Sequence, residues 1–182
     1  PRNGNELRNL LYTALEYKDG PFAIRYPKAS SEEFDQNLQA ELLPIGSWEV
    51  LQNGNDVAIL AVGPLTYLAL EAAEELKKLD ISCEVVNCRF IKPMDENYLE
   101  FMLEKFSSVL TIEEGVRSGG FGEGVLSWLS SNNYKGNSSI ISLPDKFVEH
   151  GPRGLLLEKW GINKEEIIKT VTSFKSSLKT EF

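Results

Sequence analysis

Apolar runs alternate with amphipathic segments from residue 57 to the end of the chain. Buried strands are predicted where aliphatic residues follow one another, at Val57–Val62, Ile81–Ile91, Ser108–Ile112 and Ser139–Leu143. Helices are predicted where apolar residues recur three and four positions apart, at Leu65–Leu79, from a cap at Asp95 to about Lys105, around Val125–Leu129, and at Ile162–Leu178. A short strand at Trp48–Leu51, closed by the turn Asn53-Gly54, precedes them. Strands that alternate with helices predict an α/β fold, with a parallel sheet covered on both faces and right-handed crossovers.

The first 46 residues follow a different pattern. Apolar residues predict a helix over Glu6–Tyr17, capped by Asn5 and stopped by Asp19-Gly20-Pro21. Phe22–Tyr26 reads as a strand, and the polar, acidic stretch Lys28–Gly46 as a linker. One helix and one strand cannot bury their apolar faces alone. We therefore expect this opening to be the tail of a domain whose remainder lies upstream, and to be displaced, poorly ordered or paired with another copy of the chain.

Composition narrows the classes of function. The net charge of −8 argues against a nucleic-acid binder, because neutralising phosphates requires clustered Lys and Arg. No apolar run approaches the ~20 residues that a membrane-spanning helix needs. Cys83 and Cys88 match the spacing of neither a zinc pair nor a redox Cys-x-x-Cys pair, so we expect two buried thiols in a reducing cytosol. The chain begins at Pro1 without an initiator methionine or a leader, and we expect it to be a piece of a longer protein.

The most informative stretch is Glu113–Val125, where an apolar run halts at two carboxylates and a glycine-rich turn leads into the next helix. In α/β sheets, ligands and partner surfaces gather where strands end in this way. The glycines miss the Gly-x-Gly-x-x-Gly register of a dinucleotide site, because Val125 stands where a glycine or alanine is needed. We favour glycines that let the helix start pack closely on the sheet or on a partner subunit. Binding of an anion at the helix N-terminus stays open as the alternative.

Glu113 and Glu114 invite interpretation as a general acid/base pair. Adjacent residues on a regular strand point to opposite faces, so the two carboxylates do not converge on one substrate atom. We therefore favour capping of loops, or pairing with Arg117, over catalysis.

His150, the only histidine, lies in a loop of mixed charges. A catalytic histidine needs an orienting partner, which Asp145 or Glu149 could supply. We favour a contact at a domain or subunit boundary for this side chain. The sequence shows no serine elbow, metal-ligand cluster or Walker loop.

Arg25 differs in kind from these candidates. It ends the predicted strand, is followed by Tyr26-Pro27 and Lys28, and carries a guanidinium suited to bidentate binding of a phosphate or carboxylate. A structural ion pair is the alternative.

Taken in order, four groups of residues resemble the C-terminal part of the 1-deoxy-D-xylulose-5-phosphate synthase family, and the match covers nearly the whole chain. The groups are Asn5-Glu6-Leu7-Arg8 through Asp19-Gly20-Pro21-Phe22-Ala23-Ile24-Arg25-Tyr26-Pro27, then Asn87-Cys88-Arg89-Phe90-Ile91-Lys92-Pro93-Met94-Asp95, then Glu113-Glu114-Gly115 with Gly119-Gly120-Phe121-Gly122, and last Leu143-Pro144-Asp145-Lys146-Phe147-Val148-Glu149-His150-Gly151. The wider transketolase-like family, including the β subunits of 2-oxo-acid dehydrogenases, shares the Arg-Phe-x-x-Pro-x-Asp and Glu-Glu-Gly elements. The Phe-Val-Glu-His-Gly loop and the Ile-Arg-Tyr-Pro strand end favour the synthases.

The resemblance implies three α/β/α layers around a mostly parallel five-stranded sheet with one antiparallel edge strand, as in transketolase C-terminal domains. It implies that residues 1–28 are the tail of the second, pyrimidine-binding domain, that 29–46 are a linker, and that 47–182 form the third domain. The parent enzyme would condense pyruvate with D-glyceraldehyde 3-phosphate and release CO2, using thiamine diphosphate and Mg2+. This transferase reaction opens isoprenoid synthesis by the methylerythritol phosphate route and supplies thiamine synthesis.

By the same resemblance, Arg25 is similar to an arginine that holds the phosphate of the aldehyde substrate. No catalytic, cofactor-binding or metal-binding residue carries over to this chain, which we expect to be structural and inactive alone. Its partners would be the remainder of the same enzyme, a homodimer in the cytoplasm of a bacterium or in the plastid stroma, with no nucleic acid and no membrane. Two rivals stay open: a β subunit or transketolase C-terminal domain of another thiamine diphosphate enzyme, and a freestanding anion- or nucleotide-binding module.

Overall fold

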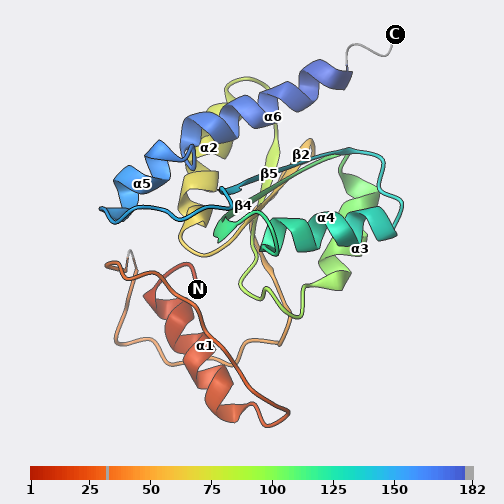
Figure 1. Cartoon of the computed structure of the whole chain (residues 1–182). Coiled ribbons are helices and arrows are strands. Elements are labelled where there is room, and N and C mark those ends of the chain that lie inside the picture. Colours follow the sequence, from red (N-terminus) through yellow and green to blue (C-terminus); the bar gives the residue numbers. More distant parts are fainter. Residues whose placement is uncertain (32, 179–182) are drawn as a thin grey trace.

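A five-stranded sheet organises the chain from residue 49 onward (Figure 1). The computed structural model describes residues 1–31 and 33–178. The elements are α1 (Gly4–Glu16), β1 (Glu49–Gln52), β2 (Val57–Ala61), α2 (Leu65–Lys77), β3 (Cys83–Asn87), α3 (Glu96–Lys105), β4 (Ser108–Val116), α4 (Phe121–Ser131), β5 (Asn137–Leu143), α5 (Arg153–Lys159) and α6 (Lys164–Leu178). The strand order is β1-β3-β2-β4-β5, with β1 antiparallel to β3 and the other pairs parallel. The predicted mostly parallel α/β sheet with one antiparallel edge is confirmed.

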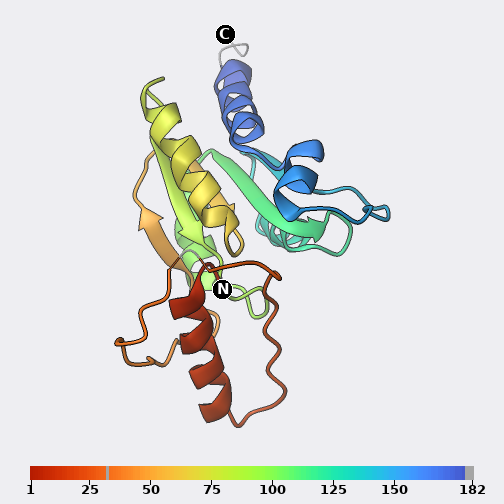
Figure 2. The same cartoon turned by 90° about the vertical axis from the view of Figure 1, so that its left-hand side faces the viewer.

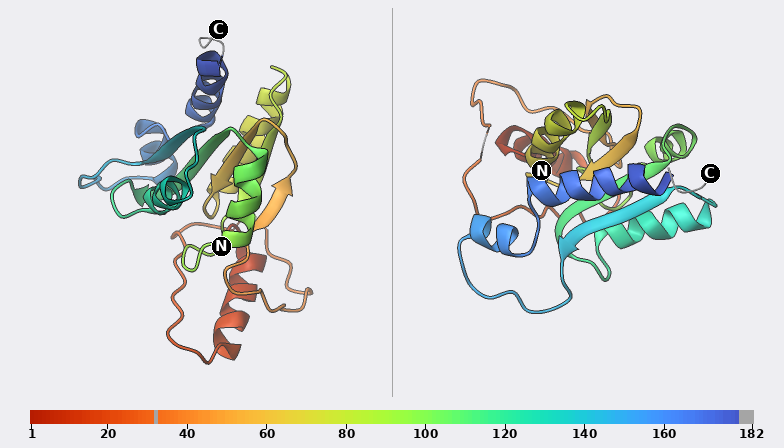
Figure 3. Two further views of the ribbon diagram at one scale, coloured as in Figure 1. Left: turned by 90° about the vertical axis from the view of Figure 1, so that its right-hand side faces the viewer. Right: turned by 90° about the horizontal axis from the view of Figure 1, so that it is seen from above.

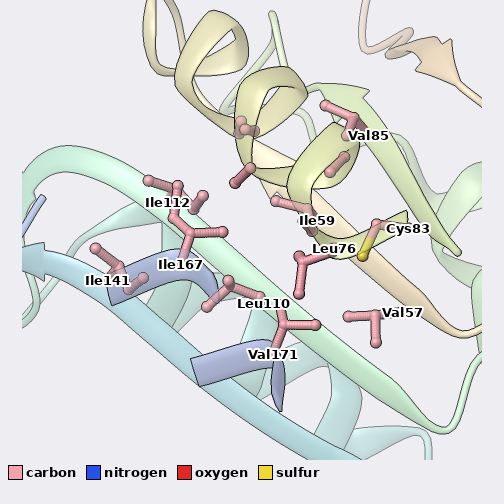
Figure 4. Packing of buried hydrophobic residues seen from close by; sticks show 14 of the residues in the cluster. Val57, Ile59, Leu76, Cys83, Val85, Leu110, Ile112, Ile141, Ile167 and Val171 are labelled. Atoms are coloured by element: carbon pink, nitrogen blue, oxygen red, sulfur yellow. The ribbon is translucent and has the colours of Figure 1, made fainter. Parts of the chain in front are cut away.

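One face of the sheet is covered by α2 and α6. Figure 4 shows Leu76 of α2 with Ile167 and Val171 of α6 among the aliphatic side chains of the sheet. The central strands are buried on both faces, because β2 and β3 carry no residue that the solvent reaches appreciably. This is why their sequences read as continuous apolar runs rather than as alternating ones.

The other face is covered by α3 and α4, which bury Leu99, Met102, Val125 and Leu129 against it. Figures 1 and 3 show these two green helices on the side of the sheet away from α6. Asp95 caps α3 as predicted, accepting a hydrogen bond from the backbone N–H of Tyr98 at 3.0 Å. Among the described residues, no helix combines the length and the apolar content needed to cross a bilayer.

A buried ion pair crosses from the sheet to α3. The side chain of Glu84 is 1% exposed, and its carboxylate accepts hydrogen bonds from Lys105 Nζ at 2.6 Å and from the Tyr98 hydroxyl at 2.8 Å. Burial, followed by the hydrogen bond to Glu84, raises the pKa of Tyr98 well above its ordinary range. The phenol therefore stays protonated and donates to the carboxylate at all physiological pH values.

Several element boundaries differ from the sequence-based prediction, and one helix was missed. β3 ends at Asn87, four residues before Ile91, because the bond from the Cys88 N–H to the carbonyl oxygen of Ala61 is the last one to β2 among the described residues. β4 extends to Val116, which pairs with Leu143 of β5 after an irregularity in the register. The short helix α5 was not predicted, since its seven residues are too few for a clear apolar period.

The N-terminal segment departs further from prediction. Asn3, not Asn5, caps α1, accepting a hydrogen bond from the backbone N–H of Glu6 at 2.9 Å. Phe22–Tyr26 forms no strand, because no strand of the sheet lies beside it to complete the ladder. The expectation that the opening is displaced, poorly ordered or paired with another copy stays a prediction. The first turn of α1 is attached to the sheet, where Asn87 of β3 donates a hydrogen bond to Glu6 at 2.5 Å. The rest of the helix projects away from the sheet (Figure 2).

Candidate functional site

A cleft of about 850 Å³ separates the N-terminal segment from the sheet. One wall is the extended segment after α1. The other wall is built where three parallel strands end, which is the edge at which α/β sheets place their ligands. The lining comprises Pro21–Pro27, Val62–Pro64, Cys88–Pro93, Glu113–Val116 and Gly119–Phe121, together with Pro1, Leu10, Tyr17 and Ile45. Figure 3 shows the red N-terminal segment at the end of the sheet opposite the C-terminus of α6.

Glu113 lies at the base of this cleft and is 5% exposed. Its carboxylate accepts hydrogen bonds from the backbone N–H groups of Phe121 at 3.0 Å and Gly122 at 2.7 Å. These are the first free donors of α4, whose N-cap, Gly120, has no side chain to satisfy them. The anion at this helix N-terminus is therefore the chain's own carboxylate, placed where the helix dipole favours a negative charge.

The glycines of the turn permit this approach. A Cβ at Gly120 would stand 2.3 Å from the carbonyl oxygen of Val116 and 2.7 Å from Glu113 Oε1. A Cβ at Gly122 would stand 2.5 Å from Thr111 Oγ1 and 2.8 Å from the side chain of Ile140. Close packing of the helix start on the sheet, the favoured interpretation of the sequence, is confirmed.

Glu114 points to a different partner. Its carboxylate is held by the guanidinium of Arg153, with Nε 2.8 Å from Oε2 and Nη2 bonded to Oε1. The hydrogen bond to Glu114 raises the pKa of Arg153 further above its ordinary value. The prediction that the two adjacent glutamates point to different partners is confirmed. The expected pairing with Arg117 is wrong, because Glu114 pairs with Arg153 at the start of α5.

Three cationic side chains line the cleft. Arg89 is engaged, with Nε donating to the carbonyl oxygen of Ser47 at 3.0 Å and Nη2 to its hydroxyl at 2.8 Å. Arg25 is exposed and lies on the opposite wall, and Lys92 is exposed beside Arg89. The alternative of a structural ion pair for Arg25 is not realised within the described residues, where no carboxylate contacts it.

The cysteines do not supply a nucleophile. Both are free thiols, buried in or directly after β3, and Cys88 lines the cleft. Burial raises the pKa of Cys83 to about 12 and that of Cys88 well above its ordinary value. Both therefore stay protonated near neutral pH, the form in which a thiol is inert.

His150 lies outside the cleft, on the exposed loop that leads to α5. One of its candidate orienting partners, Glu149, forms an ion pair with Lys159 instead. No described residue makes a hydrogen bond or ion pair with the imidazole, so the arrangement of a catalytic histidine is missing here. Phe147, three positions earlier, is fully exposed.

The described residues do not form a metal site. No group of three or more His, Cys, Asp or Glu side chains among them is placed to hold an ion. The two carboxylates that the cleft does offer, Glu113 and Glu114, are already bound by backbone N–H groups and by Arg153. The residues present therefore do not fit a Mg2+–diphosphate group by themselves.

Sequence reasoning did not assign a role to Lys92, Arg153 or Asn87. Arg153 and Glu114 are 39 positions apart, a separation at which local patterns carry no information. Lys92 follows a predicted strand in the Arg-Phe-x-x-Pro-x-Asp element, and this position after a strand end was the available signal. Asn87 ends an apolar strand with a polar residue, which is a recognisable sign of a site at the sheet edge.

Comparison with known proteins agrees with this architecture. The family model described as "Transketolase, C-terminal domain" matches residues 46–167. 1-Deoxy-D-xylulose-5-phosphate synthases of Bacillus cereus and Bacillus anthracis are 42% identical over 174 residues, which cover 94% of this chain and 27% of those proteins. The chain thus spans about a quarter of the length of these relatives.

Among solved structures, a split-gene transketolase in its inactive β4 tetramer superposes with a TM-score of 0.84 at 31% identity, over 95% of this chain and 55% of that one. The family model spans the sheet, α2 to α5 and the start of α6, and the superposition extends the likeness to nearly the whole chain. The chain is therefore a member of the transketolase C-terminal domain family.

Proposed function

We propose that this chain is the C-terminal portion of a 1-deoxy-D-xylulose-5-phosphate synthase. The observation that carries the proposal is the 42% identity over 174 residues, which cover 94% of this chain. The parent enzyme would join pyruvate to D-glyceraldehyde 3-phosphate with loss of CO2, using thiamine diphosphate and Mg2+. Its product would feed isoprenoid and thiamine synthesis.

The domain division follows from the same assignment. Residues 1–28 would be the tail of the second domain, 29–46 a linker, and 47–182 the third domain. The uncovered face of α1 supports this division, because Leu11 is 51% and Leu15 is 72% exposed in a helix whose Leu10 is buried. An amphipathic helix gains most of its stability from packing of the apolar face. The missing cover would be the upstream part of the second domain, in an enzyme that works as a homodimer.

Arg25 would bind the phosphate of the aldehyde substrate. It is exposed, lines the cleft at the strand ends, and has no anionic partner among the described residues. A free guanidinium offers a planar fork of N–H donors that matches two phosphate oxygens. The rest of the machinery would lie in the parts of the enzyme that this chain does not include, so the chain alone would not turn over substrate.

A chimera tests the proposal. The chain replaces the C-terminal quarter of the Bacillus cereus synthase, and formation of 1-deoxy-D-xylulose 5-phosphate is assayed alongside the 182-residue chain. We expect activity from the chimera only. In the chimera, Arg25→Gln should raise the KM for D-glyceraldehyde 3-phosphate about tenfold or more, as expected for one lost charge-assisted hydrogen bond, while the KM for pyruvate stays the same. A folded, dimeric chimera without synthase activity would refute the proposal, and product made by the chain alone would refute its incompleteness.

The structural likeness favours a second candidate, a separately encoded C-terminal chain of a transketolase, because the split-gene transketolase superposes at a TM-score of 0.84. The same chimera separates the two. A transketolase chain would support ketol transfer between sugar phosphates when joined to a transketolase N-terminal chain and would not support the pyruvate reaction. The third candidate, an anion-binding module at the start of α4, is opposed by Glu113, which already occupies the N–H groups of Phe121 and Gly122.

A further inference from the structure

Two cations in the cleft have no partner among the described residues. Arg25 and Lys92 are both exposed and both line the cleft, Arg25 in the segment after α1 and Lys92 in the segment after β3. None of the ion pairs or hydrogen bonds of the described residues involves either side chain. This distinguishes them from Arg89, whose guanidinium is bonded to Ser47.

The anionic groups of the same cleft already have partners. Glu113 is bound by two backbone N–H groups at the positive end of α4. Glu114 is bound by the guanidinium of Arg153. Arg25, Arg89 and Lys92 therefore leave the cleft with an excess of positive charge, and of these three Arg89 is already committed to Ser47 by hydrogen bonds. A cleft with convergent charge of one sign concentrates ligands of the opposite sign.

The two walls are held against each other by ring contacts. Phe22, three positions before Arg25, packs edge-on against Phe90, two positions before Lys92, with ring centroids 6.3 Å apart. Tyr17 braces Phe22 from α1 at 5.8 Å. Trp48 Nε1 donates to the carbonyl oxygen of Phe90 at 2.8 Å, which fixes the second wall to the sheet edge. The backbones that carry both cations are thus positioned relative to one another before any ligand arrives.

We propose that Lys92 is the second cation of an oxyanion site and binds, together with Arg25, the phosphoryl group of a phosphorylated substrate. This rests on the proposed function only in that Arg25 is taken there as a phosphate ligand. The guanidinium supplies the bidentate contact that sets orientation, and the ammonium supplies a mobile point charge against the second negative charge of a phosphate dianion. The apolar residues between the walls, among them Phe22 and Phe90, leave room for a short carbon chain.

Titration of the 182-residue chain with inorganic phosphate, and in parallel with D-glyceraldehyde 3-phosphate, tests the site by backbone-amide NMR. We expect shifts centred on Ala23–Tyr26 and Arg89–Lys92, and a dissociation constant raised about five- to tenfold by Lys92→Gln, as fits the loss of one charged contact. Lys92→Arg should restore most of the affinity. The matched control is Lys135→Gln, which removes the same charge from an exposed lysine between α4 and β5, outside the cleft, and should leave the affinity unchanged.

Each outcome decides between the assignments. Equal weakening by Lys92→Gln and Lys135→Gln would show a general effect of net charge and overturn the role of Lys92. If Arg25→Gln weakens phosphate binding and Lys92→Gln does not, the role of Lys92 is overturned as well, while the proposed phosphate contact of Arg25 stands. Binding that needs both cations, with a chimera that makes no 1-deoxy-D-xylulose 5-phosphate, would support the cation pair and refute the synthase. No binding of either phosphate at millimolar concentrations would overturn both cation assignments, and unchanged amide spectra of the variants show that they fold.

Discussion

Two helices of equal length, α1 and α2, differ in how far their apolar faces are buried. Each has 13 residues and an apolar stripe. α2 buries Ala69, Ala72, Ala73 and Leu76 completely, whereas α1 leaves Leu11 and Leu15 mostly exposed. The spacing of apolar residues in a helix thus shows which face is packed against a partner. It does not show whether that partner is part of the same chain.

The difference lies in what surrounds each helix. α2 is enclosed by the sheet on one side and by α6 along its length, in the layered arrangement of Figure 1. α1 is attached by its first turn, where Glu6 accepts a hydrogen bond from Asn87 and Asn3 Nδ2 donates to the Tyr67 hydroxyl at 3.1 Å. These contacts fix the position of the helix but bury only part of its apolar face, since Leu10 is buried and Leu11 and Leu15 are not. The sheet domain is therefore a unit that stands by its own packing, and the N-terminal segment is not.

The largest effect should come from one substitution made in both helices. Leu76→Ala removes a fully buried side chain and should lower the free energy of unfolding by about 2–5 kcal/mol. Leu15→Ala removes a side chain that is 72% exposed and should change it by less than about 0.5 kcal/mol. Chemical denaturation of both variants measures the difference. A comparable loss from Leu15→Ala would mean that α1 is covered in solution, for example by a second copy of the chain, and would break the contrast.

A second pair of substitutions, at Gly122 and Gly124, tests the junction of β4 and α4, where the cleft meets the sheet domain. Gly122→Ala places a methyl group against Thr111 and Ile140, and this overpacking should cost about 1–3 kcal/mol. Gly124→Ala, in the same helix, meets only Met94 Sδ at 4.0 Å and should stabilise the chain by about 0.5–1 kcal/mol through helix propensity. Thermal unfolding of both variants gives the two signs. Two stabilised variants would show that the turn does not require close approach.

The third variant tests the attachment of α1 alone. Glu6→Ala removes the hydrogen bond between Asn87 and α1 and should weaken the attachment by about 1–2 kcal/mol, while the Asn87 amide keeps its bond to Glu49 at 3.2 Å. Amide exchange should accelerate throughout α1 and stay unchanged in β2. Glu16→Ala, at the exposed end of the same helix, is the control and should alter neither. Faster exchange in β2 would mean that the two regions unfold as one.

The same contrast explains which features could be predicted from the sequence. Val57–Ala61 and the Asp95 cap are specified by neighbours along the chain, and both were predicted correctly. Close packing of the helix start was favoured because the glycines miss the dinucleotide register, and the close approach at Gly122 confirms it. The strand expected at Phe22–Tyr26 failed because strand formation needs a partner edge, which propensity does not reveal.

The capping residue of α1 failed for a related reason. Asn3 and Asn5 are equally good N-caps by residue type, and the choice fell to Asn3 because its amide also donates to Glu33 and Tyr67. In the site, Arg25 was a candidate from its local sequence alone. The pairing of Glu114 with Arg153 could not be predicted from local sequence, because the two residues are 39 positions apart and only the fold brings them together.

The smallest expected effect concerns the buried thiol of Cys83 in β3. Burial raises the pKa of Cys83 from its ordinary value of 9.0 to about 12, so the folded chain keeps this proton over a pH range in which the unfolded chain loses it. The stabilisation is complete below the unfolded pKa and is lost as the pH rises toward the folded one. Between pH 8 and about 9.5 the free energy of unfolding should fall by less than about 1 kcal/mol for this thiol. Denaturant titrations of the wild type and of Cys83→Ala measure the two slopes. A steeper loss in the variant would contradict the assignment, whereas a shallower one would show that the sheet domain excludes water from Cys83 as its packing implies.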